Sequence, residues 1–278
     1  MTADEIVKFI SKELEGVPGI AGVVLGGSRA RGNAGPASDI DIGIYYDESD
    51  GFSVGDLSRI AGQFDDEHRE NLVSPLGGWG PWVNAGGWLV VQGLHVDLIL
   101  RDINRVSRVI DDCLSGNVST HYHAGHPHAF LNVMYMGEVS VCKVLSDPNG
   151  KIAALKAKTN PYPSELQKAL IGYFRFEASF SSIHADSSAS RDDISFVAGC
   201  CFRTIACMNQ ALFAKNKEYC INEKKAAALV NGFSVKPKDY KERVDRIFTL
   251  LSTDETQTRE GVDLLKELVR ETDMLLDQ

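Results

Sequence analysis

The chain has 278 residues, room for two domains of about 100–200 residues each, and its 44% hydrophobic content is enough for packed cores. Its 38 acidic and 29 basic residues give a formal net charge of −9, which would repel a phosphate backbone and argues against nucleic acid as a partner. A small or cationic substrate is compatible with this charge.

The N-terminal segment predicts an amphipathic helix over residues 3–15, with Ile6, Phe9, Ile10 and Leu14 at helical spacing. It is acidic, unlike a signal peptide, and no run in the sequence approaches a membrane span of roughly 18 apolar residues. We therefore expect a cytoplasmic protein with no membrane partner. The six cysteines form no CxxC pair, so we expect reduced, buried thiols.

The next segments predict a sheet. GVPGIAGVVLGG ends the first helix and begins an apolar strand, DIDIGIYY alternates as a second strand, and GGWLVVQGLHVDLIL reads as two strands joined near Gln92-Gly93. Helices are expected over 54–70 and 102–114. The loop SPLGGWGPWVNAGG is too aromatic to be only a linker.

The composition changes near SDPNGKIAALKAKTNPYPSE, where turn residues surround one short helix, and everything after it has helical periodicity. We place the boundary there, with one domain at 1–158 and another at 159–278. The predicted fold class is α+β: a mixed β-sheet domain with flanking helices, followed by an all-helical bundle.

Asp39 and Asp41 would share one face of their strand, with Ile40 and Ile42 on the core face, because strand side chains alternate. Their Cα atoms would lie about 6.6 Å apart, so both carboxylates could reach one hard cation. Carboxylates this close repel each other unless a cation compensates, and Mg²⁺ bound by carboxylates and substrate phosphates supplies that charge.

Asp97 in LHVDLIL is the third candidate, on the face opposite Val96 and Leu98. If its strand neighbours that of Asp39 and Asp41, three carboxylates converge and a site for two metal ions becomes feasible. The alternative, three solvated strand residues, is disfavoured because strands are depleted in Asp.

The acidic pair follows a glycine-rich turn, VVLGGSRARG. A strand that ends in Gly26-Gly27-Ser28 offers backbone N–H groups, an unhindered approach and a hydroxyl, which suit a triphosphate. A glycine pair alone is more often a simple turn. Its short, fixed link to Asp39 and Asp41 is what favours a nucleotide site.

These motifs support a family resemblance. GGSRARGNAGPASDIDIGI, with HVDLIL downstream, resembles the signature of the nucleotidyltransferase superfamily that includes DNA polymerase beta. The two-domain length is similar to its antibiotic branch, the aminoglycoside and lincosamide enzymes, and NQALFAKNKEYCINEKKA resembles the helical half of bacterial members. The resemblance implies a catalytic nucleotidyltransferase domain followed by a helical substrate-binding domain.

The resemblance also implies roles for individual residues. Gly27 and Ser28 would hold the β- and γ-phosphates, Asp39 and Asp41 would bind Mg²⁺, and Asp97 would bind a second Mg²⁺ or act as base. An acceptor hydroxyl would attack the α-phosphate of a nucleoside triphosphate in line and release pyrophosphate; we take the nucleotide to be ATP, so that AMP is transferred.

Four basic residues have two interpretations. Arg29 and Arg31 could contact phosphate oxygens or form helix-surface ion pairs, and we count Arg31 among the nucleotide-binding candidates. Lys156 and Lys158 could contact the triphosphate, although a solvated helix face is the stronger interpretation.

The segment SGNVSTHYHAGHPHAF reads as an irregular connection rich in histidine. Its cluster could line the site near base or acceptor, lie at the surface, or less plausibly bind a structural metal. The four histidines are His121, His123, His126 and His128.

Two glutamates in the helical half are also candidates to contact a polyhydroxylated or cationic acceptor. Glu177 stays open between this and a structural role. For Glu223 we favour a role at a helix N-terminus capped by Asn222, where an acid stabilises the helix dipole.

The leading hypothesis is AMP transfer to a hydroxyl of a small molecule, with an antibiotic as the acceptor class by resemblance only. The alternatives are a protein-modifying nucleotidyltransferase, like small antitoxin-type members, and a nucleotide-sensing protein without turnover. The first is typically one minimal domain and the second would lack a carboxylate, neither of which fits this sequence. The oligomeric state stays open, a homodimer included.

Overall fold

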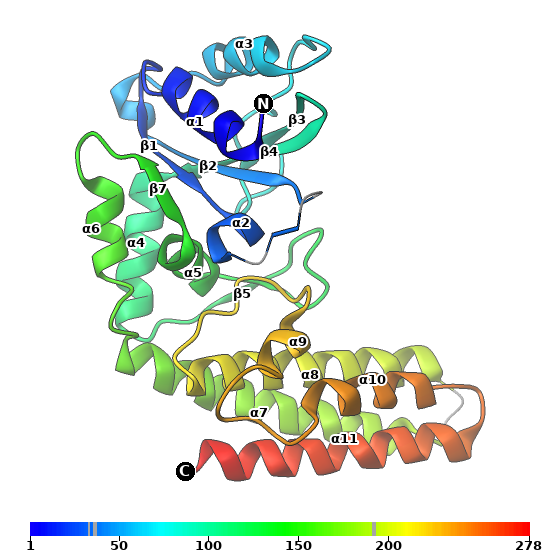
Figure 1. Ribbon diagram of the computed structural model, residues 1–278. Coiled ribbons are helices and arrows are strands. Elements are labelled where there is room, and N and C mark those ends of the chain that lie inside the picture. The colour runs from blue at the N-terminus through cyan, green and yellow to red at the C-terminus, as the bar shows by residue number, and fades with distance from the viewer. Residues whose placement is uncertain (33, 36–37, 191–192) are drawn as a thin grey trace. The chain divides into compact units, whose positions relative to one another are not determined.

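The computed structural model describes residues 1–32, 34–35, 38–190 and 193–278 (Figure 1). Within it the chain forms two compact units. The sheet unit comprises residues 1–111 and 135–161, and the helical unit comprises residues 112–134 and 162–278. Residues 112–134 thus group with the helices, whereas the sequence analysis kept them in the first domain. Compactness alone does not test a functional boundary, so the division into 1–158 and 159–278 stays a prediction.

The sheet unit contains a five-stranded mixed sheet in the order β3-β4-β2-β1-β7, in which β2 and β4 are parallel and the other neighbours antiparallel. Its strands are β1 (Ile20–Leu25), β2 (Ile40–Tyr46), β3 (Ala85–Val91), β4 (Leu94–Asp102) and β7 (Lys143–Ser146). The predicted turn between β3 and β4 is confirmed: Gln92 and Gly93 both have positive φ, as in a two-residue hairpin turn of type I′. Together with the helices described below, this sheet confirms the α+β fold class.

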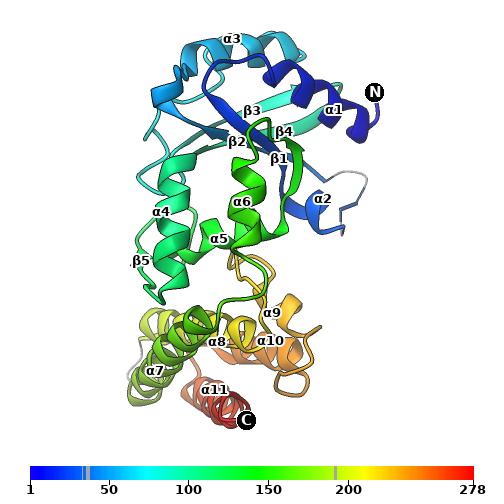
Figure 2. The same ribbon diagram turned by 90° about the vertical axis from the view of Figure 1, so that its left-hand side faces the viewer.

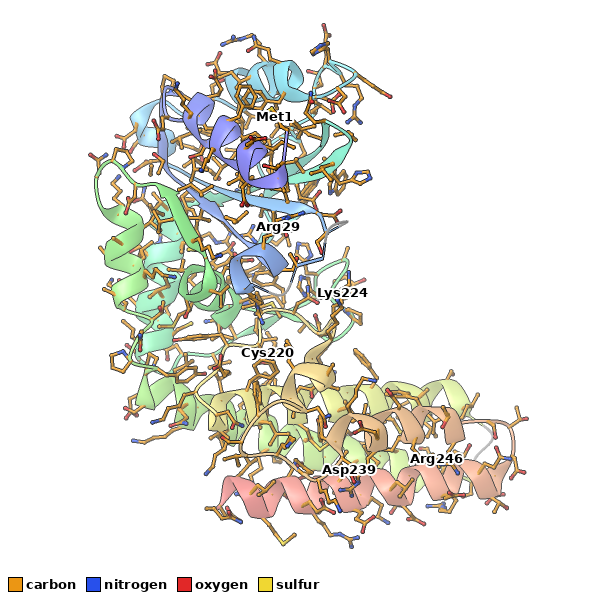
Figure 3. The ribbon with its side chains drawn as sticks, in the orientation of Figure 1. Met1, Arg29, Cys220, Lys224, Asp239 and Arg246 are labelled. Atoms are coloured by element: carbon orange, nitrogen blue, oxygen red, sulfur yellow. The ribbon has the colours of Figure 1, made fainter. Side chains whose placement is uncertain are left out.

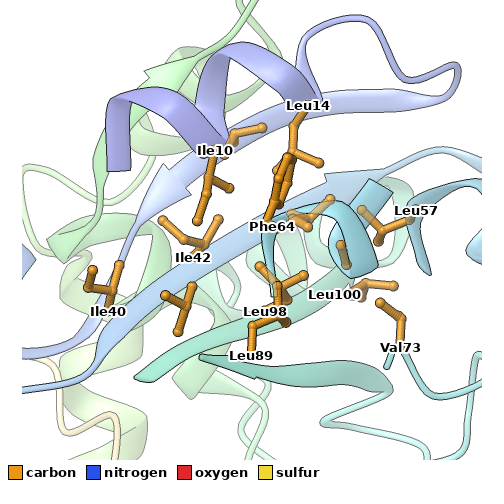
Figure 4. Packing of buried hydrophobic residues seen from close by; sticks show 14 of the residues in the cluster. Ile10, Leu14, Ile40, Ile42, Leu57, Phe64, Val73, Leu89, Leu98 and Leu100 are labelled. Carbon is orange, nitrogen blue, oxygen red and sulfur yellow. The ribbon is translucent and has the colours of Figure 1, made fainter. Parts of the chain in front are cut away.

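One face of the sheet carries the main apolar core (Figure 4). Helices α1 (Ala3–Leu14) and α3 (Val54–Phe64) cover it. The expected alternation is what builds this core, because Ile40, Ile42 and Ile44 of β2 are completely buried.

Helix α3 ends earlier than the predicted 54–70. Asp65, fully buried, accepts hydrogen bonds from the Arg69 guanidinium (Nε, 2.9 Å) and from the backbone N–H of Val90 on β3 (3.0 Å). The Arg69 guanidinium holds the pKa of Asp65 well below its usual range. The chain leaves the helix here because this buried carboxylate ties the following loop to the sheet.

The opposite face is covered by α5 (Val133–Val141) and α6 (Lys151–Ala157) (Figure 2). Helix α4 (Ile103–Leu114) follows β4 as predicted, whereas α5 and β7 were not anticipated. Helix α5 is apolar on nearly all sides, with its buried residues not confined to one stripe. Such a helix shows no amphipathic period, so periodicity does not detect it.

The helical unit consists mainly of five helices: α7 (Ser164–Ser188), α8 (Ile194–Lys215), α9 (Ala226–Val230), α10 (Tyr240–Leu250) and α11 (Glu255–Leu276). The segment from the first domain adds the short pair β5 (Thr120–His121) and β6 (Phe130–Leu131). Among the described helices, α8 alone is long and apolar enough to cross a membrane, yet 67% of its apolar window is buried inside the structure. It is a core helix of this unit.

Candidate active site

A row of three side chains crosses the sheet on the face opposite the main core. In the β2–β4 pairing Asp41 lies directly opposite Asp97, and in the β4–β3 pairing Asp97 lies opposite Trp88. Directly opposed residues of neighbouring strands project from the same face. The condition set by the sequence is therefore met: the strand of Asp97 neighbours that of Asp41.

Further along the strands, the same face of the sheet is buried. Asp41 and Asp97 are half-buried, whereas Tyr45 and Arg101, four residues on, are buried. The Arg101 guanidinium makes a two-pronged ion pair with Glu138 of α5, at 2.8 and 2.7 Å. Burial alone would lower the pKa of Arg101, but Glu138 outweighs it and raises the pKa above its usual range. Helix α5 thus covers one end of the face and leaves the carboxylate end open.

The glycine-rich turn lies against Asp41. Strand β1 ends at Leu25, the backbone N–H of Gly26 donates to the carbonyl of Asp41 (2.8 Å), and α2 (Gly27–Arg31) begins immediately. Gly27 has φ +58°, and a Cβ there would overlap the Asp41 carboxylate. Only glycine allows that carboxylate to lie directly against the turn.

Asp39 and Arg29 lie where the chain enters β2. The Arg29 guanidinium, labelled on α2 in Figure 3, donates to the carbonyls of Ser38 (2.6 Å) and Asp39 (3.2 Å). Neither interpretation of Arg29, a phosphate ligand or a surface ion pair, describes this contact: it fixes the backbone that enters β2. Asp39 itself is exposed just before β2, and Arg31 is half-buried at the end of α2.

Negatively charged side chains lie close together near the start of β2. Burial, and after it the Asp39 carboxylate, raises the pKa of Asp97, while His95 opposes the shift. Asp39 is therefore close enough to Asp97 to act on it electrostatically. The structure brings the three predicted carboxylates together in a partly exposed region beside the glycine-rich turn.

Residues 3–115 match the nucleotidyltransferase domain family, over less than half of the chain. These residues form a nucleotidyltransferase domain of the superfamily that includes DNA polymerase beta. This domain type implies transferase activity. No curated protein matches the sequence.

Among solved structures, a nucleotidyltransferase-like protein from Exiguobacterium sibiricum aligns with 99% of this chain and 74% of its own. The two share 11% sequence identity, and the TM-score is 0.46. At this distance the similarity adds nothing to the assignment.

Two tryptophans beside the carboxylates of the nucleotidyltransferase domain were not singled out by the sequence analysis. Trp88 is 64% exposed and stacks on Trp79, with ring centroids 4.7 Å apart. The Trp79 ring lies over Gly86, where a Cβ would collide with it. The aromatic character of the 74–87 loop was the available signal, because Trp79 of this loop packs on Trp88 of β3.

Lys143 is a second residue that sequence reasoning missed. It pairs with Leu25 in the β7–β1 register, and its Nζ lies 3.3 Å from the carbonyl of Arg29. This places an exposed ammonium group beside the glycine-rich turn. Strand β7 was not predicted, so nothing in the sequence indicated this position.

The two lysines considered as triphosphate partners have structural roles instead. The Lys156 ammonium donates to the carbonyls of Val139 (3.1 Å), Ser140 and Cys142 (2.8 Å) at the end of α5. Lys158 forms an ion pair with Asp111 (2.6 Å). Lys156 is half-buried rather than on a solvated face, and its ammonium group satisfies carbonyl groups left free at the end of α5.

Within the helical unit, Glu223 holds the histidine-rich segment. Its carboxylate contacts the His126 ring (Nδ1, 3.0 Å) and accepts from the backbone N–H groups of His128 (3.1 Å) and Ala129 (3.2 Å). Burial alone would raise the pKa of Glu223, but these donors outweigh it and lower the pKa. The favoured role at a helix N-terminus is wrong: α9 begins only at Ala226, and the Glu223 side chain binds another segment.

The other histidines have separate environments. His121 contacts the Ser119 hydroxyl (2.9 Å), and the buried His123 contacts the carbonyl of Ala124 (2.8 Å). His128 lies near Glu177, which also pairs with Arg203; His128 and then Arg203 lower the pKa of Glu177 despite its burial. These side chains do not form one four-histidine group.

Proposed function

We propose that the protein transfers a nucleoside monophosphate, AMP from ATP in the first instance, to a hydroxyl group of a small molecule. One observation carries the proposal: within a nucleotidyltransferase domain, Asp41 and Asp97 lie opposite each other and the Asp41 carboxylate lies against Gly27. Gly27 and Ser28 are then the phosphate-binding residues, with Arg31 beside them, and Lys143 is added to this group.

The donor set fits Mg²⁺. Asp39, Asp41 and Asp97 offer only hard oxygen ligands. Burial, and after it the Asp39 carboxylate, raises the pKa of Asp97, and a bound cation would favour its charged form again. When bound, Mg²⁺, in one or two ions, would neutralise charge on the reacting phosphates.

The order of the strands suggests where the acceptor enters. In-line transfer needs the attacking hydroxyl and the departing pyrophosphate on opposite sides of the phosphorus. The glycine-rich turn follows β1 on one side of the carboxylate-bearing strands β2 and β4, and Trp88 stands on β3 at the other side. With pyrophosphate at the turn, the acceptor would approach across the Trp79–Trp88 pair.

The aromatic pair narrows the acceptor class. An exposed tryptophan face binds the apolar face of a sugar or another ring, and it also attracts cations. Aminoglycosides and lincosamides, cationic compounds built on sugars, are therefore the first class to test, in keeping with the net charge of −9. We further propose a cytoplasmic enzyme that needs neither nucleic acid nor membrane; homodimerisation stays open.

The test is pyrophosphate release from ATP, GTP, CTP and UTP with Mg²⁺, against a panel of aminoglycosides and lincosamides. Wild type should release pyrophosphate only when an acceptor is present, and Asp41→Asn should reduce the rate at least about 100-fold. Asp56→Asn, an exposed carboxylate on α3, is the matched control and should leave the rate unchanged.

Two other outcomes would redirect the assignment. Nucleotide transfer to a protein, with none to any small molecule, would favour a protein-modifying enzyme. Nucleotide binding without turnover, with every acceptor, would favour a sensor and contradict the proposed transfer to small molecules.

A further inference from the structure

Three side chains from separate segments converge in the helical unit. His128 precedes β6, Glu177 is on α7 and Cys207 is on α8. One ligand atom from each lies within 4.8 Å of the other two. All three side chains are largely shielded: the His128 side chain is 4% exposed, that of Glu177 is 12% exposed, and Cys207 is fully buried.

The spacing within the cluster is close to that of metal ligands. The His128 Nε2 atom is 3.7 Å from the Glu177 Oε1 atom, beyond an ordinary N–H···O hydrogen bond, and 3.7 Å from the Cys207 Sγ atom, the distance of a weak hydrogen bond to sulfur. Ligands around a tetrahedral zinc ion, with bonds of about 2.0–2.3 Å, are separated by roughly 3.3–3.6 Å. A small movement would therefore place all three atoms at bonding distance from one ion.

The cluster is also held in place before any ion binds. Glu223 fixes the backbone N–H groups of His128 and Ala129, so the segment that carries His128 is anchored independently of its ring. The other two ligands stand on α7 and α8, whose mutual contact is the most extensive between any two described elements of the chain. Rigid supports of this kind lower the cost of ordering a metal site.

We propose that His128, Glu177 and Cys207 bind one zinc ion, with a fourth, exchangeable position occupied by water. Imidazole, thiolate and carboxylate together are a donor set typical of zinc, and they exclude Mg²⁺ and Ca²⁺, which require oxygen ligands. Binding converts the Cys207 thiol to thiolate and releases one proton to solvent. The site is separate from the carboxylates of the nucleotidyltransferase domain and does not depend on the proposed function.

Arg203 sets the affinity of this site. Its guanidinium pairs with the same Glu177 oxygen that faces His128, and its side chain is 58% exposed. The guanidinium therefore competes with a cation for that oxygen but can move into solvent. Removing its charge should strengthen zinc binding, whereas loss of a merely structural ion pair would not.

The experiment uses the full chain after treatment with a chelator. Zn²⁺ alone is titrated against a chromophoric competitor, and Co²⁺ is then used as a spectroscopic substitute. We expect one zinc per chain, a rise in Tm with Zn²⁺, and a near-ultraviolet thiolate-to-cobalt band that the carboxylate site, lacking sulfur, cannot give.

Variants at three positions decide the assignment. Cys207→Ser should weaken zinc binding at least about 10-fold and abolish the cobalt band, while Cys201→Ser, equally buried on α8, should retain both. Arg203→Gln, at an exposed position, should bind zinc more tightly. No stoichiometric zinc in the wild type, a cobalt band that persists in Cys207→Ser, or unchanged affinity in Arg203→Gln would each overturn the proposal.

Discussion

The carboxylate row of the sheet unit and the His128–Glu177–Cys207 cluster of the helical unit gather reactive groups in opposite ways. The carboxylates come from neighbouring strands, share one charge and stay partly exposed. The cluster comes from a connection and two helices, combines different chemical groups and is shielded. The sheet register places like charges side by side, which costs electrostatic repulsion, whereas in the helical core most buried polar groups have partners.

This difference separates how the two regions should respond to substitution. Substitutions of the carboxylates in the sheet unit should change the reaction rate with little effect on stability, because solvent still reaches these side chains. Changes to the buried polar groups of the helical unit should alter stability first, because their partners are left without hydrogen bonds.

The largest expected effect on stability is at Glu223. Replacing it with Ala leaves the His126 ring and two backbone N–H groups without their acceptor, so the free energy of unfolding should fall by about 2–4 kcal/mol. Urea unfolding followed by circular dichroism measures the change. Glu165→Ala, at an exposed position on α7, is the control and should change stability by less than about 0.5 kcal/mol. Equal effects at the two positions would mean that Glu223 does not anchor the segment.

A smaller effect is expected at the aromatic pair. Trp88→Ala removes the exposed face that we assign to the acceptor, so the KM for the acceptor should rise about 10-fold, while the KM for the nucleotide stays unchanged. Steady-state kinetics with the acceptor identified above would separate the two constants. An increase in the KM for the nucleotide alone would place the base, not the acceptor, on these rings.

The smallest expected effect is a gain in stability from Asp97→Asn. Because the folded protein raises the pKa of Asp97 above 3.8, the folded state binds this proton more tightly, and stability falls as pH rises through the raised pKa. Removing the charge should therefore add a few tenths of a kcal/mol at pH 7, after allowance for solvent screening, and nothing below about pH 4. Thermal melting in metal-free buffer at both pH values measures it. A loss of stability at pH 7 would show that the carboxylate is structurally required there.

Period-2 alternation and turn chemistry predicted β1, β2, the β3–β4 hairpin and the faces of Asp41 and Asp97 correctly, because these features depend on residues close in sequence. Around the sheet, three elements were predicted poorly for identifiable reasons. Helix α5 is apolar all round, α3 is cut short by Asp65, and β7 is only four residues long at the edge of the sheet. The catalytic and nucleotide-binding roles of the predicted site residues remain predictions.

The sequence by itself determined that Asp41 points away from the buried Ile40 and Ile42 and follows a glycine-rich turn, because strand alternation and glycine's freedom at positive φ act locally. Only the tertiary structure decided that Asp97 lies opposite Asp41, that Trp88 flanks it, and that Glu223 binds a segment far away in the chain. Strand order and helix packing depend on the burial of apolar surface over the whole chain. They therefore cannot be predicted from any short stretch of sequence.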